Sequence, residues 1–285
     1  MTMPEQEQGN ERISPTAWTI AHRRTVTDIP YSKAIFGEIE KLRELQGVDI
    51  PDQLKSPEIA PQIEARYKLV SRLLAQNRIE QVLEIAAGFS PRGLELTENR
   101  ATYVEVDLPG IMTQKKKIVN SIGSNENLFL EEGNALDATS LQTATRHFDR
   151  SKPLGIIHEG LLRYLTFEQK ATVARNIHKI LSAFNGVWIT PDITLKAVVQ
   201  AENTATQQTT GIVGELIGVN IDKNSFEDVN HAQRFFEGLD FSVERHSFME
   251  VIDELSSPAA LHQTRQNVEA LINAAYVFVM RTKEK

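Results

Sequence analysis

The feature that most constrains the fold of this chain is an alternation between short apolar runs, rich in β-branched residues, and longer segments with helical periodicity. Parallel strands need a crossover of roughly a dozen residues or more, usually a helix, so this alternation predicts an α/β fold. We expect a seven-stranded, mostly parallel sheet with helices on both faces. The predicted strands lie at 81–86, 102–107, 128–132, 154–158, 186–191, 241–248 and 275–281.

The clearest predicted helix spans 166–184. Thr166 and Gln169 have the spacing of a capping box, in which the side chains of both residues bind backbone N–H groups of the first turn. Asn185 and Gly186 follow, and both residue types favour the backbone conformation that ends helices. Six apolar residues share one face of this helix: Phe167, Ala171, Ala174, Ile177, Leu181 and Phe184.

The length of 285 residues fits one large α/β domain, and we expect a single domain over 15–285. The polar segment 1–14 is predicted to be a disordered tail. Two helical segments are longer than a simple crossover needs: an N-terminal cap at 15–76, with a helix at 59–76, and an insertion at 195–238. Both are predicted to cover a ligand crevice at the carboxyl ends of the strands.

Composition argues against several classes of function. The net charge of −7 gives no global basic field for nucleic acid, and Lys115, Lys116 and Lys117 are interpreted as a solvated helix face. The chain has no cysteine, hence no disulfide or thiolate nucleophile, which is compatible with the cytoplasmic location that we expect. No segment resembles a signal peptide or a membrane span. We therefore expect neither a nucleic-acid nor a membrane partner, and the oligomeric state stays open.

The segment after the first predicted strand, QVLEIAAGFSPRG, has small residues where a backbone turn could approach a ligand. Glu84, Ala86 and Gly88 stand at alternate positions around this turn. Small residues after a strand also serve tight packing, so the turn alone is a weak signal for a site.

An acidic residue ends the second predicted strand. Asp107 lies 19 residues after Gly88, a spacing that suits a carboxylate accepting hydrogen bonds from ribose hydroxyls, and Leu108 follows it. The alternative is that Asp107 caps a helix that begins at Pro109. The turn lacks the full GxGxxG pattern that packs against a pyrophosphate, which disfavours a nicotinamide dinucleotide and hence a dehydrogenase.

The fourth predicted strand runs into His158, Glu159 and Gly160. A buried Glu159 would be costly without a partner, and at this edge it could contact the amino group of a bound amino-acid moiety or help neutralise a sulfonium. His158 with Glu159 suggests an HExxH zinc site, but Leu162 occupies the second histidine position, so we expect no metal. The sequence also has no GxSxG nucleophile elbow.

Several ordered motifs together resemble the leucine carboxyl methyltransferase family, which includes bacterial O-methyltransferases of polyketide biosynthesis. The resemblance covers roughly 15–193 and rests on PTAWTIAHRR, IEARYKLV, VLEIAAGFSPRG, TYVEVDLPGIMTQKKKIV, GNALD and HEGLLRYLT. It implies a Rossmann-like class I methyltransferase fold, with S-adenosyl-L-methionine bound at the carboxyl ends of the strands.

The resemblance also implies roles for individual residues. Arg66 looks like the arginine that binds the methionine carboxylate, and Arg24 resembles a basic residue near the same pocket. Arg92 matches a position that is often basic, with a structural ion pair as the alternative. The other matches are Ala86 and Gly88 with the glycine turn, Asp107 with the ribose-binding acid, Asn134 and Ala135 with the adenine-contacting pair, and Glu159 with the acid after the fourth strand. Their neighbours Glu84, Leu108 and Gly160 complete the predicted donor site.

Three places depart from the family pattern. Ala86 replaces a glycine, Asn134 replaces an aspartate, and Ser90 with Pro91 replaces Asp and Thr. Alanine tolerates most turns of negative φ, and an asparagine amide oxygen can still accept a hydrogen bond from adenine. The departures motivate an alternative function, a catalytically silent S-adenosylmethionine-binding module of the same fold.

The class of acceptor is inferred from acid–base chemistry. A carboxylic acid, with an ordinary pKa of about 3.5 to 4, is anionic at neutral pH, whereas a phenol with a pKa of about 10 would usually need a base. The family pattern assigns no such base. We therefore expect an O-methyltransferase of a small-molecule or peptide acceptor, with a carboxylate favoured. Arg163 and Tyr164 are the predicted acceptor contacts, although Tyr164 could equally be a packing aromatic.

Overall fold

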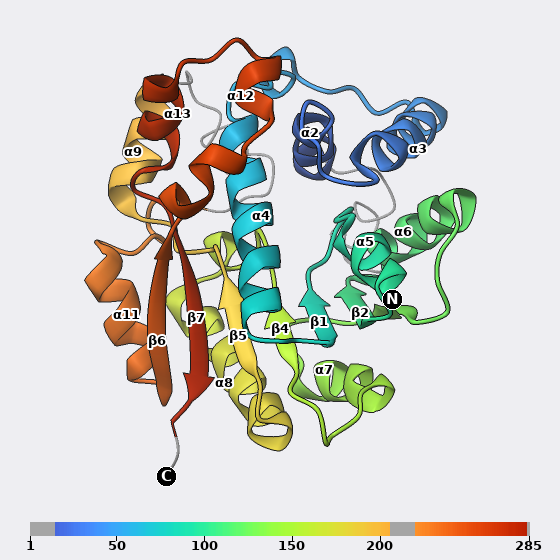
Figure 1. Cartoon of the computed structure of the whole chain (residues 1–285), viewed down its shortest axis with the longest axis vertical. Coiled ribbons are helices and arrows are strands. Elements are labelled where there is room, and N and C mark those ends of the chain that lie inside the picture. Colours follow the sequence, from blue (N-terminus) through green and yellow to red (C-terminus); the bar gives the residue numbers. More distant parts are fainter. Residues whose placement is uncertain (1–14, 206–219, 284–285) are drawn as a thin grey trace, which may run out of the picture.

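The computed structural model describes residues 15–205 and 220–283 (Figure 1). Within them lies a seven-stranded sheet of order β3-β2-β1-β4-β5-β7-β6. Each strand agrees with a predicted strand to within one residue at either end, which confirms the predicted sheet. The strands are β1 (Gln81–Ile85), β2 (Thr102–Asp107), β3 (Leu128–Glu132), β4 (Gly155–Ile157), β5 (Val187–Thr190), β6 (Phe241–Ser247) and β7 (Tyr276–Thr282).

The sheet is parallel from β3 through β5, and β7 runs antiparallel to its neighbours β5 and β6. The strand order reverses at β1, with β2 and β3 on one side and β4 and β5 on the other. At such a switch point the connections leave in opposite directions and open a crevice at the carboxyl ends of the strands. The loops after β1 and β4 therefore border the place where a ligand is expected.

Helices surround this sheet. They are α2 (Pro15–Arg24), α3 (Ser32–Gln46), α4 (Ala60–Gln76), α5 (Arg92–Glu98), α6 (Pro109–Ile122), α7 (Ala138–Ala144), α8 (Phe167–Phe184), α9 (Lys196–Ala205), α11 (Val229–Glu237), α12 (Ser257–Ala260) and α13 (Arg265–Ile272). Short 3₁₀ turns are η2 (Asp52–Leu54), η3 (Thr145–His147), η4 (Leu162–Tyr164) and η5 (Phe248–Glu254). The described residues contain no helix that is long and apolar enough to span a membrane.

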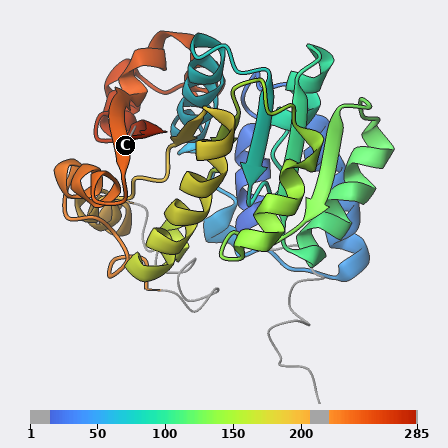
Figure 2. The same ribbon diagram turned by 90° about the horizontal axis from the view of Figure 1, so that it is seen from below.

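Both faces of the sheet bury an apolar core (Figures 1 and 2). On one face, α4, α13 and η5 pack over a core that includes Val82, and on the other face α7, α8 and α11 pack over a core that includes Leu83. These adjacent residues point to opposite sides because side chains alternate along a strand. The predicted helices on both faces are therefore confirmed.

The predicted ends of α8 are also confirmed. Thr166 accepts a hydrogen bond from the backbone N–H of Gln169, and the Gln169 side chain accepts one from the backbone N–H of Thr166, which completes the capping box. Asn185 has the left-handed backbone conformation that ends the helix, with φ of 48°.

The N-terminal helices form a third core with the region after β1. Trp18 of α2 and Ile35 of α3 pack with Phe89, which follows β1, and with Leu94 of α5. In Figure 1, α2 lies beside the upper end of α4, which is the end toward which β1 points, and α3 lies on the other side of α2. Their role as a cap over a ligand stays a prediction. The predicted covering role of the 195–238 insertion also stays a prediction, because the middle part of this insertion lies outside the described residues. The predicted disordered tail at 1–14 lies outside them as well.

Candidate functional site

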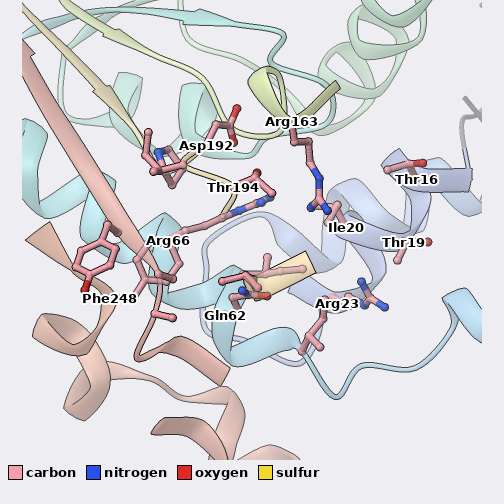
Figure 3. Close-up of a pocket in the computed structure, with 18 of the residues that line it drawn as sticks. Thr16, Thr19, Ile20, Arg23, Gln62, Arg66, Arg163, Asp192, Thr194 and Phe248 are labelled. Atoms are coloured by element: carbon pink, nitrogen blue, oxygen red, sulfur yellow. The ribbon is translucent and has the colours of Figure 1, made fainter. Parts of the chain in front are cut away.

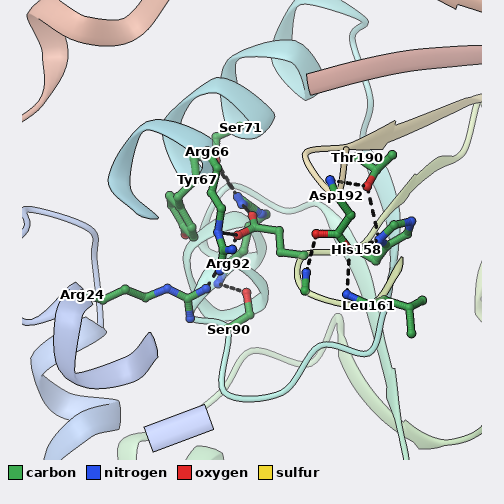
Figure 4. Close-up of polar contacts among 12 residues, drawn as sticks. Arg24, Arg66, Tyr67, Ser71, Ser90, Arg92, His158, Leu161, Thr190 and Asp192 are labelled. Atoms are coloured by element: carbon green, nitrogen blue, oxygen red, sulfur yellow. Dashed lines mark hydrogen bonds and ion pairs between the residues drawn. The ribbon is translucent and has the colours of Figure 1, made fainter. Parts of the chain in front are cut away.

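Three arginines surround Glu159 at the carboxyl ends of β1 and β4, and Figure 4 shows Arg24, Arg66 and Arg92 converging there. Arg92, the first residue of α5, binds Oε1 of Glu159. Arg66 of α4 places Nε 3.0 Å from Oε2, and Arg24 of α2 places Nη2 3.8 Å from the same oxygen. Arg24 also donates a hydrogen bond to the backbone carbonyl of Phe89 at 3.3 Å. This arginine cluster therefore joins α2 and α4 to the loops after β1 and β4.

Positive charge is in excess in the arginine cluster. Burial alone would raise the pKa of Glu159, but Arg92, Arg66 and Arg24 outweigh that effect and hold the pKa below its ordinary value. Among the residues described, none gives Oε2 of Glu159 or Nε of Arg66 a hydrogen bond of good geometry, although both atoms are buried. Buried polar groups normally complete their hydrogen bonds. The cluster therefore suits a zwitterionic ligand, whose carboxylate and ammonium would supply the missing partners.

Asp107 ties the end of β2 to the turn after β1. Its Oδ2 accepts a hydrogen bond from the backbone N–H of Gly88, and its Oδ1 accepts one from Leu108, both at 2.7 Å. Burial raises the pKa of Asp107, and these two N–H groups oppose the shift. The helix-cap alternative is wrong, because the N-cap residue of α6 is Leu108 and no side chain caps that helix.

The turn after β1 has a left-handed backbone at two residues, Ala86 with φ of 53° and Gly88 with φ of 50°. Ala86 therefore lies outside the turns of negative φ that alanine tolerates. An L residue in this conformation brings Cβ too close to the following carbonyl oxygen, which costs roughly 1–2 kcal/mol. Alanine thus keeps the shape of a glycine turn at an energetic cost that glycine would avoid.

The buried side chain of Lys115 contacts the same turn. It donates a hydrogen bond to the backbone carbonyl of Ser90, and its Nζ lies 2.8 Å from Oε2 of Glu105. Burial raises the pKa of Glu105 to about 7, against the opposing effect of Lys115. Both side chains are fully buried, so the interpretation of the three lysines as one solvated face is wrong for Lys115 and holds for exposed Lys117.

The predicted adenine contacts lie on the same edge of the sheet as Asp107. The backbone N–H of Gly133 donates to the carbonyl of Asp107 at 2.8 Å, and Asn134 and Ala135 follow directly. Asn134 is exposed, and the carbonyl of Ala135 accepts a hydrogen bond from Asn176 of α8 at 3.0 Å.

Glu84 of β1 is buried beneath the arginine cluster. Its Oε2 accepts a hydrogen bond from the Tyr103 hydroxyl at 2.8 Å. Burial raises the pKa of Glu84, and the nearby charge of Arg92 opposes the shift. Glu84 is thus a buried support beside the turn.

Another buried carboxylate, Asp192, follows β5. Its Oδ1 accepts a hydrogen bond from the backbone N–H of Gly160 at 2.7 Å, and its Oδ2 accepts from Leu161 at 2.6 Å and Leu162 at 3.1 Å. His158 Nδ1 lies 2.9 Å from Oδ2 (Figure 4). Burial alone would raise the pKa of Asp192, but His158 and the backbone N–H groups hold it far below its ordinary range. Asp192 therefore fixes the loop between β4 and α8.

A cavity of about 150 Å³ adjoins the arginine cluster (Figure 3). Arg66 belongs to both places, because it pairs with Glu159 and also lines the cavity. The side chains of Arg66 and Arg163 point into the same space, and Arg23 lines it from α2. Apolar side chains form much of the remaining wall: Ile20, Ile63, Ile193, Val198 and Phe248.

Both predicted acceptor residues line this cavity. Arg163 and Tyr164 belong to η4, and the guanidinium of Arg163 lies 5.8 Å from the centre of the Tyr164 ring. The structure therefore brings the predicted donor and acceptor residues to neighbouring places at the carboxyl ends of the strands.

Sequence reasoning missed three residues of this region. Asp192 directly follows a strand at the carboxyl edge, and that position is a signal that could have identified it. Lys115 falls three residues after Met112 and three before Ile118, on the apolar face of α6, which could have marked it as buried. Arg23 had no comparable signal, because its proximity to the cavity depends on how α2 packs.

A family model described as leucine carboxyl methyltransferase matches residues 15–178. No curated protein matches the sequence.

Three solved structures resemble this chain, and the first two, with TM-scores above 0.5, show the likeness in fold. A DUF574 family protein from Streptomyces avermitilis is 15% identical, with a TM-score of 0.55 and coverage of 92% of this chain and 96% of that chain. A SAM-dependent methyltransferase from Anabaena variabilis is 10% identical, with a TM-score of 0.54 and coverage of 90% and 97%. A candidate O-methyltransferase from Nostoc punctiforme is 13% identical, with a TM-score of 0.47; the match covers 78% of this chain and this chain spans 58% of that one.

Proposed function

The chain belongs to the leucine carboxyl methyltransferase family and uses S-adenosyl-L-methionine, and from this premise we propose that it methylates an oxygen of a small carboxylate acceptor. The observation that carries the proposal is the excess of arginine charge shared by the arginine cluster and the adjoining cavity. Two anionic groups can be accommodated there, the carboxylate of the donor and that of the acceptor.

The donor's charged end is held in the arginine cluster. Arg66 binds the methionine carboxylate, because its planar guanidinium can offer paired hydrogen bonds. Glu159 then accepts from the donor's ammonium through Oε2, the oxygen that lacks a hydrogen bond from the described residues. Asp107 accepts from the ribose hydroxyls. A carboxylate has about four lone-pair sites, so the bonds from Gly88 and Leu108 leave capacity for a ligand.

The acceptor occupies the cavity, with its carboxylate toward Arg163. When bound, S-adenosylmethionine would supply an activated methyl group: the acceptor oxygen would form a bond to the methyl carbon as the bond from that carbon to sulfur breaks, with S-adenosylhomocysteine as the leaving group. The chain contributes by holding the two reactants in line, and a carboxylate that is already ionised needs no base. His158 does not line the cavity, and its Nδ1 is engaged with Asp192, so it is poorly placed to deprotonate an alcohol or phenol.

The donor part is tested by thermal unfolding with S-adenosylhomocysteine and with NAD. A ligand of the folded state raises the melting temperature by mass action, so S-adenosylhomocysteine should raise it and NAD should not. An equal or larger shift with NAD would contradict a methyltransferase.

The reaction is tested with a donor that carries a labelled methyl group and hexanoate as the acceptor. A methyl ester releases labelled methanol in base, whereas a methyl ether does not, so base-labile label is the expected result. Label that resists base would contradict the carboxylate. Donor binding without transfer to hexanoate or any other carboxylate would favour the silent binding module motivated by Ala86, Ser90 and Asn134.

A further inference from the structure

We propose that the acceptor is an amphipathic acid, a small carboxylic acid with an apolar body that packs inside the 150 Å³ cavity. This inference rests on the proposed function. The proposed function specifies only the carboxylate of the acceptor, and the inference describes the rest of the acceptor molecule. Three observations support it: the position of the cavity, the charge of the residues that line it, and the apolar side chains in its wall.

The position of the cavity places its contents beside the charged end of the bound donor. Arg66 pairs with Glu159 at 3.0 Å and also lines the cavity, so no layer of protein separates the two places. Asp192 lines the cavity as well, and it binds the backbone N–H of Gly160, the residue next to Glu159. A molecule in the cavity therefore meets the donor at the arginine cluster.

The charge of the cavity selects an anion. Arg23, Arg66 and Arg163 line it, and among the lining residues in the described part of the chain Asp192 is the acidic one. Both oxygens of Asp192 already accept hydrogen bonds, from three backbone N–H groups and from His158. The Asp192 charge is thus balanced locally, and the described wall of the cavity carries a net positive charge that favours a ligand carboxylate.

The walls of the cavity select an apolar body. Ile20 comes from α2, Ile63 from α4, Ile193 and Val198 from the region after β5, and Phe248 from the start of η5. A cavity needs roughly 10–15 Å³ to hold one water, so this one has room for a ligand of several heavy atoms. Water beside these side chains is released when an apolar group replaces it, which stabilises the complex.

The first experiment measures binding of butanoate, hexanoate and octanoate, and of the three matching primary amides, to protein saturated with S-adenosylhomocysteine. Each buried methylene contributes about 0.8 kcal/mol, so affinity should rise about fourfold per methylene until the cavity is full. Each amide should bind at least about tenfold more weakly than its acid, because it cannot form a charged pair with arginine.

Two variants separate the charge from the walls. Arg163→Gln should abolish the preference for acid over amide while the dependence on chain length persists. Val198→Phe should shift the preference to shorter acids, because its larger ring fills part of the cavity. Arg146→Gln is the matched control: this arginine is half exposed and pairs with Glu131 on β3, at the edge of the sheet, and it should change neither property.

The results also separate this inference from the function on which it rests. If acids and amides bind equally, or if affinity does not depend on chain length, the amphipathic acceptor is wrong while intact binding of S-adenosylhomocysteine leaves the methyltransferase standing. If wild-type protein does not bind S-adenosylhomocysteine, the proposed function fails as well. Melting temperatures of the variants, with and without S-adenosylhomocysteine, verify that they fold.

Discussion

Glu159 and Asp192 are both buried carboxylates that follow neighbouring strands, yet their charges are balanced by different kinds of partner. Glu159 is surrounded by three arginine side chains that come from α2, α4 and α5. Asp192 is held by three backbone N–H groups of a single loop and by His158. Arginine side chains can rotate toward a ligand, whereas backbone N–H groups move only if the loop itself deforms.

This difference separates the parts of the site that can exchange partners from those that set its shape. The arginine cluster can redistribute its hydrogen bonds when a zwitterion enters, because the 3.0 Å contact between Oε2 of Glu159 and Nε of Arg66 lacks the geometry of a hydrogen bond. Asp192 has no such freedom. We therefore expect Asp192 substitutions to affect stability and cluster substitutions to affect ligand affinity.

The largest effect is expected from Asp192→Asn. Removing one partner of a buried charged network is strongly destabilising, so urea unfolding at neutral pH should show a loss of about 3 kcal/mol. Asp52→Asn is the control, since Asp52 is 91% exposed and pairs with Lys55 at the surface; this substitution should leave the free energy of unfolding close to that of wild type.

The pH dependence sharpens this test. The pKa of Asp192 is lower in the folded state than its ordinary value of 3.8, so its stabilisation is complete above pH 3.8 and is lost as the pH falls toward the folded-state pKa. The difference between wild type and Asp192→Asn should therefore narrow below pH 3.8. An equal difference at pH 7 and pH 3 would contradict a charge-based role.

Asp107 tests whether a carboxylate held by backbone N–H groups can also serve a ligand. Asp107→Ala should weaken binding of S-adenosylhomocysteine by about 1.5–3 kcal/mol in calorimetry, through loss of charged hydrogen bonds to ribose. Lys116→Ala is the control, because Lys116 is 42% exposed and lies on the helix that follows. If both variants bind equally well, Asp107 only holds the turn.

Glu159→Gln keeps the shape of the side chain and removes its charge. Loss of a charge-assisted hydrogen bond of about 2 kcal/mol corresponds to about a thirtyfold weaker binding of S-adenosylhomocysteine. An analogue without the amino group is the control ligand, and its affinity should change little. Tighter binding of S-adenosylhomocysteine to the variant would mean instead that Glu159 competes with the ligand carboxylate for the arginines.

Arg66→Lys retains the positive charge but removes the planar pair of donors. We expect about a tenfold loss of affinity for S-adenosylhomocysteine, with a melting temperature of the free protein close to that of wild type. A lowered melting temperature together with unchanged affinity would mean that Arg66, like Asp192, stabilises the fold and does not bind the donor.

The smallest effect is expected from Ala86→Gly. Relief of the left-handed strain should stabilise the fold by roughly 1–2 kcal/mol, and the greater freedom of glycine in the unfolded chain offsets about 0.5–1 kcal/mol of this. A net gain of about 0.5–1 kcal/mol should appear in urea unfolding. A loss of stability would show that the methyl group of Ala86 makes contacts worth more than the strain.

The sequence was most informative where a local pattern determines the outcome. Strand bounds followed from short apolar runs, and the ends of α8 followed from Thr166, Gln169 and Asn185, because these features depend on nearby residues. The left-handed backbone of Ala86 did not follow, since it is imposed by the surrounding turn and not favoured by alanine itself.

The site was predictable as a set of residues and less so as a set of partners. Arg24, Arg66, Arg92 and Glu159 were all selected from the sequence, but their convergence into one cluster depends on how α2 and α4 pack against the sheet. Sequence separation gives no measure of that packing. The pairing of Asp192 with the loop after β4 was missed for the same reason.

The double membership of Arg66, in the arginine cluster and in the cavity wall, makes the binding of the two reactants interdependent. One guanidinium can be neutralised by only one carboxylate at a time. A bound donor therefore lowers the affinity of the cavity for an acid, and a bound acid lowers the affinity for the donor by the same factor. Under the proposed function this coupling is unfavourable and favours ordered binding with the donor first. An acid at high concentration should then reach Arg66 ahead of the donor and inhibit its own methylation.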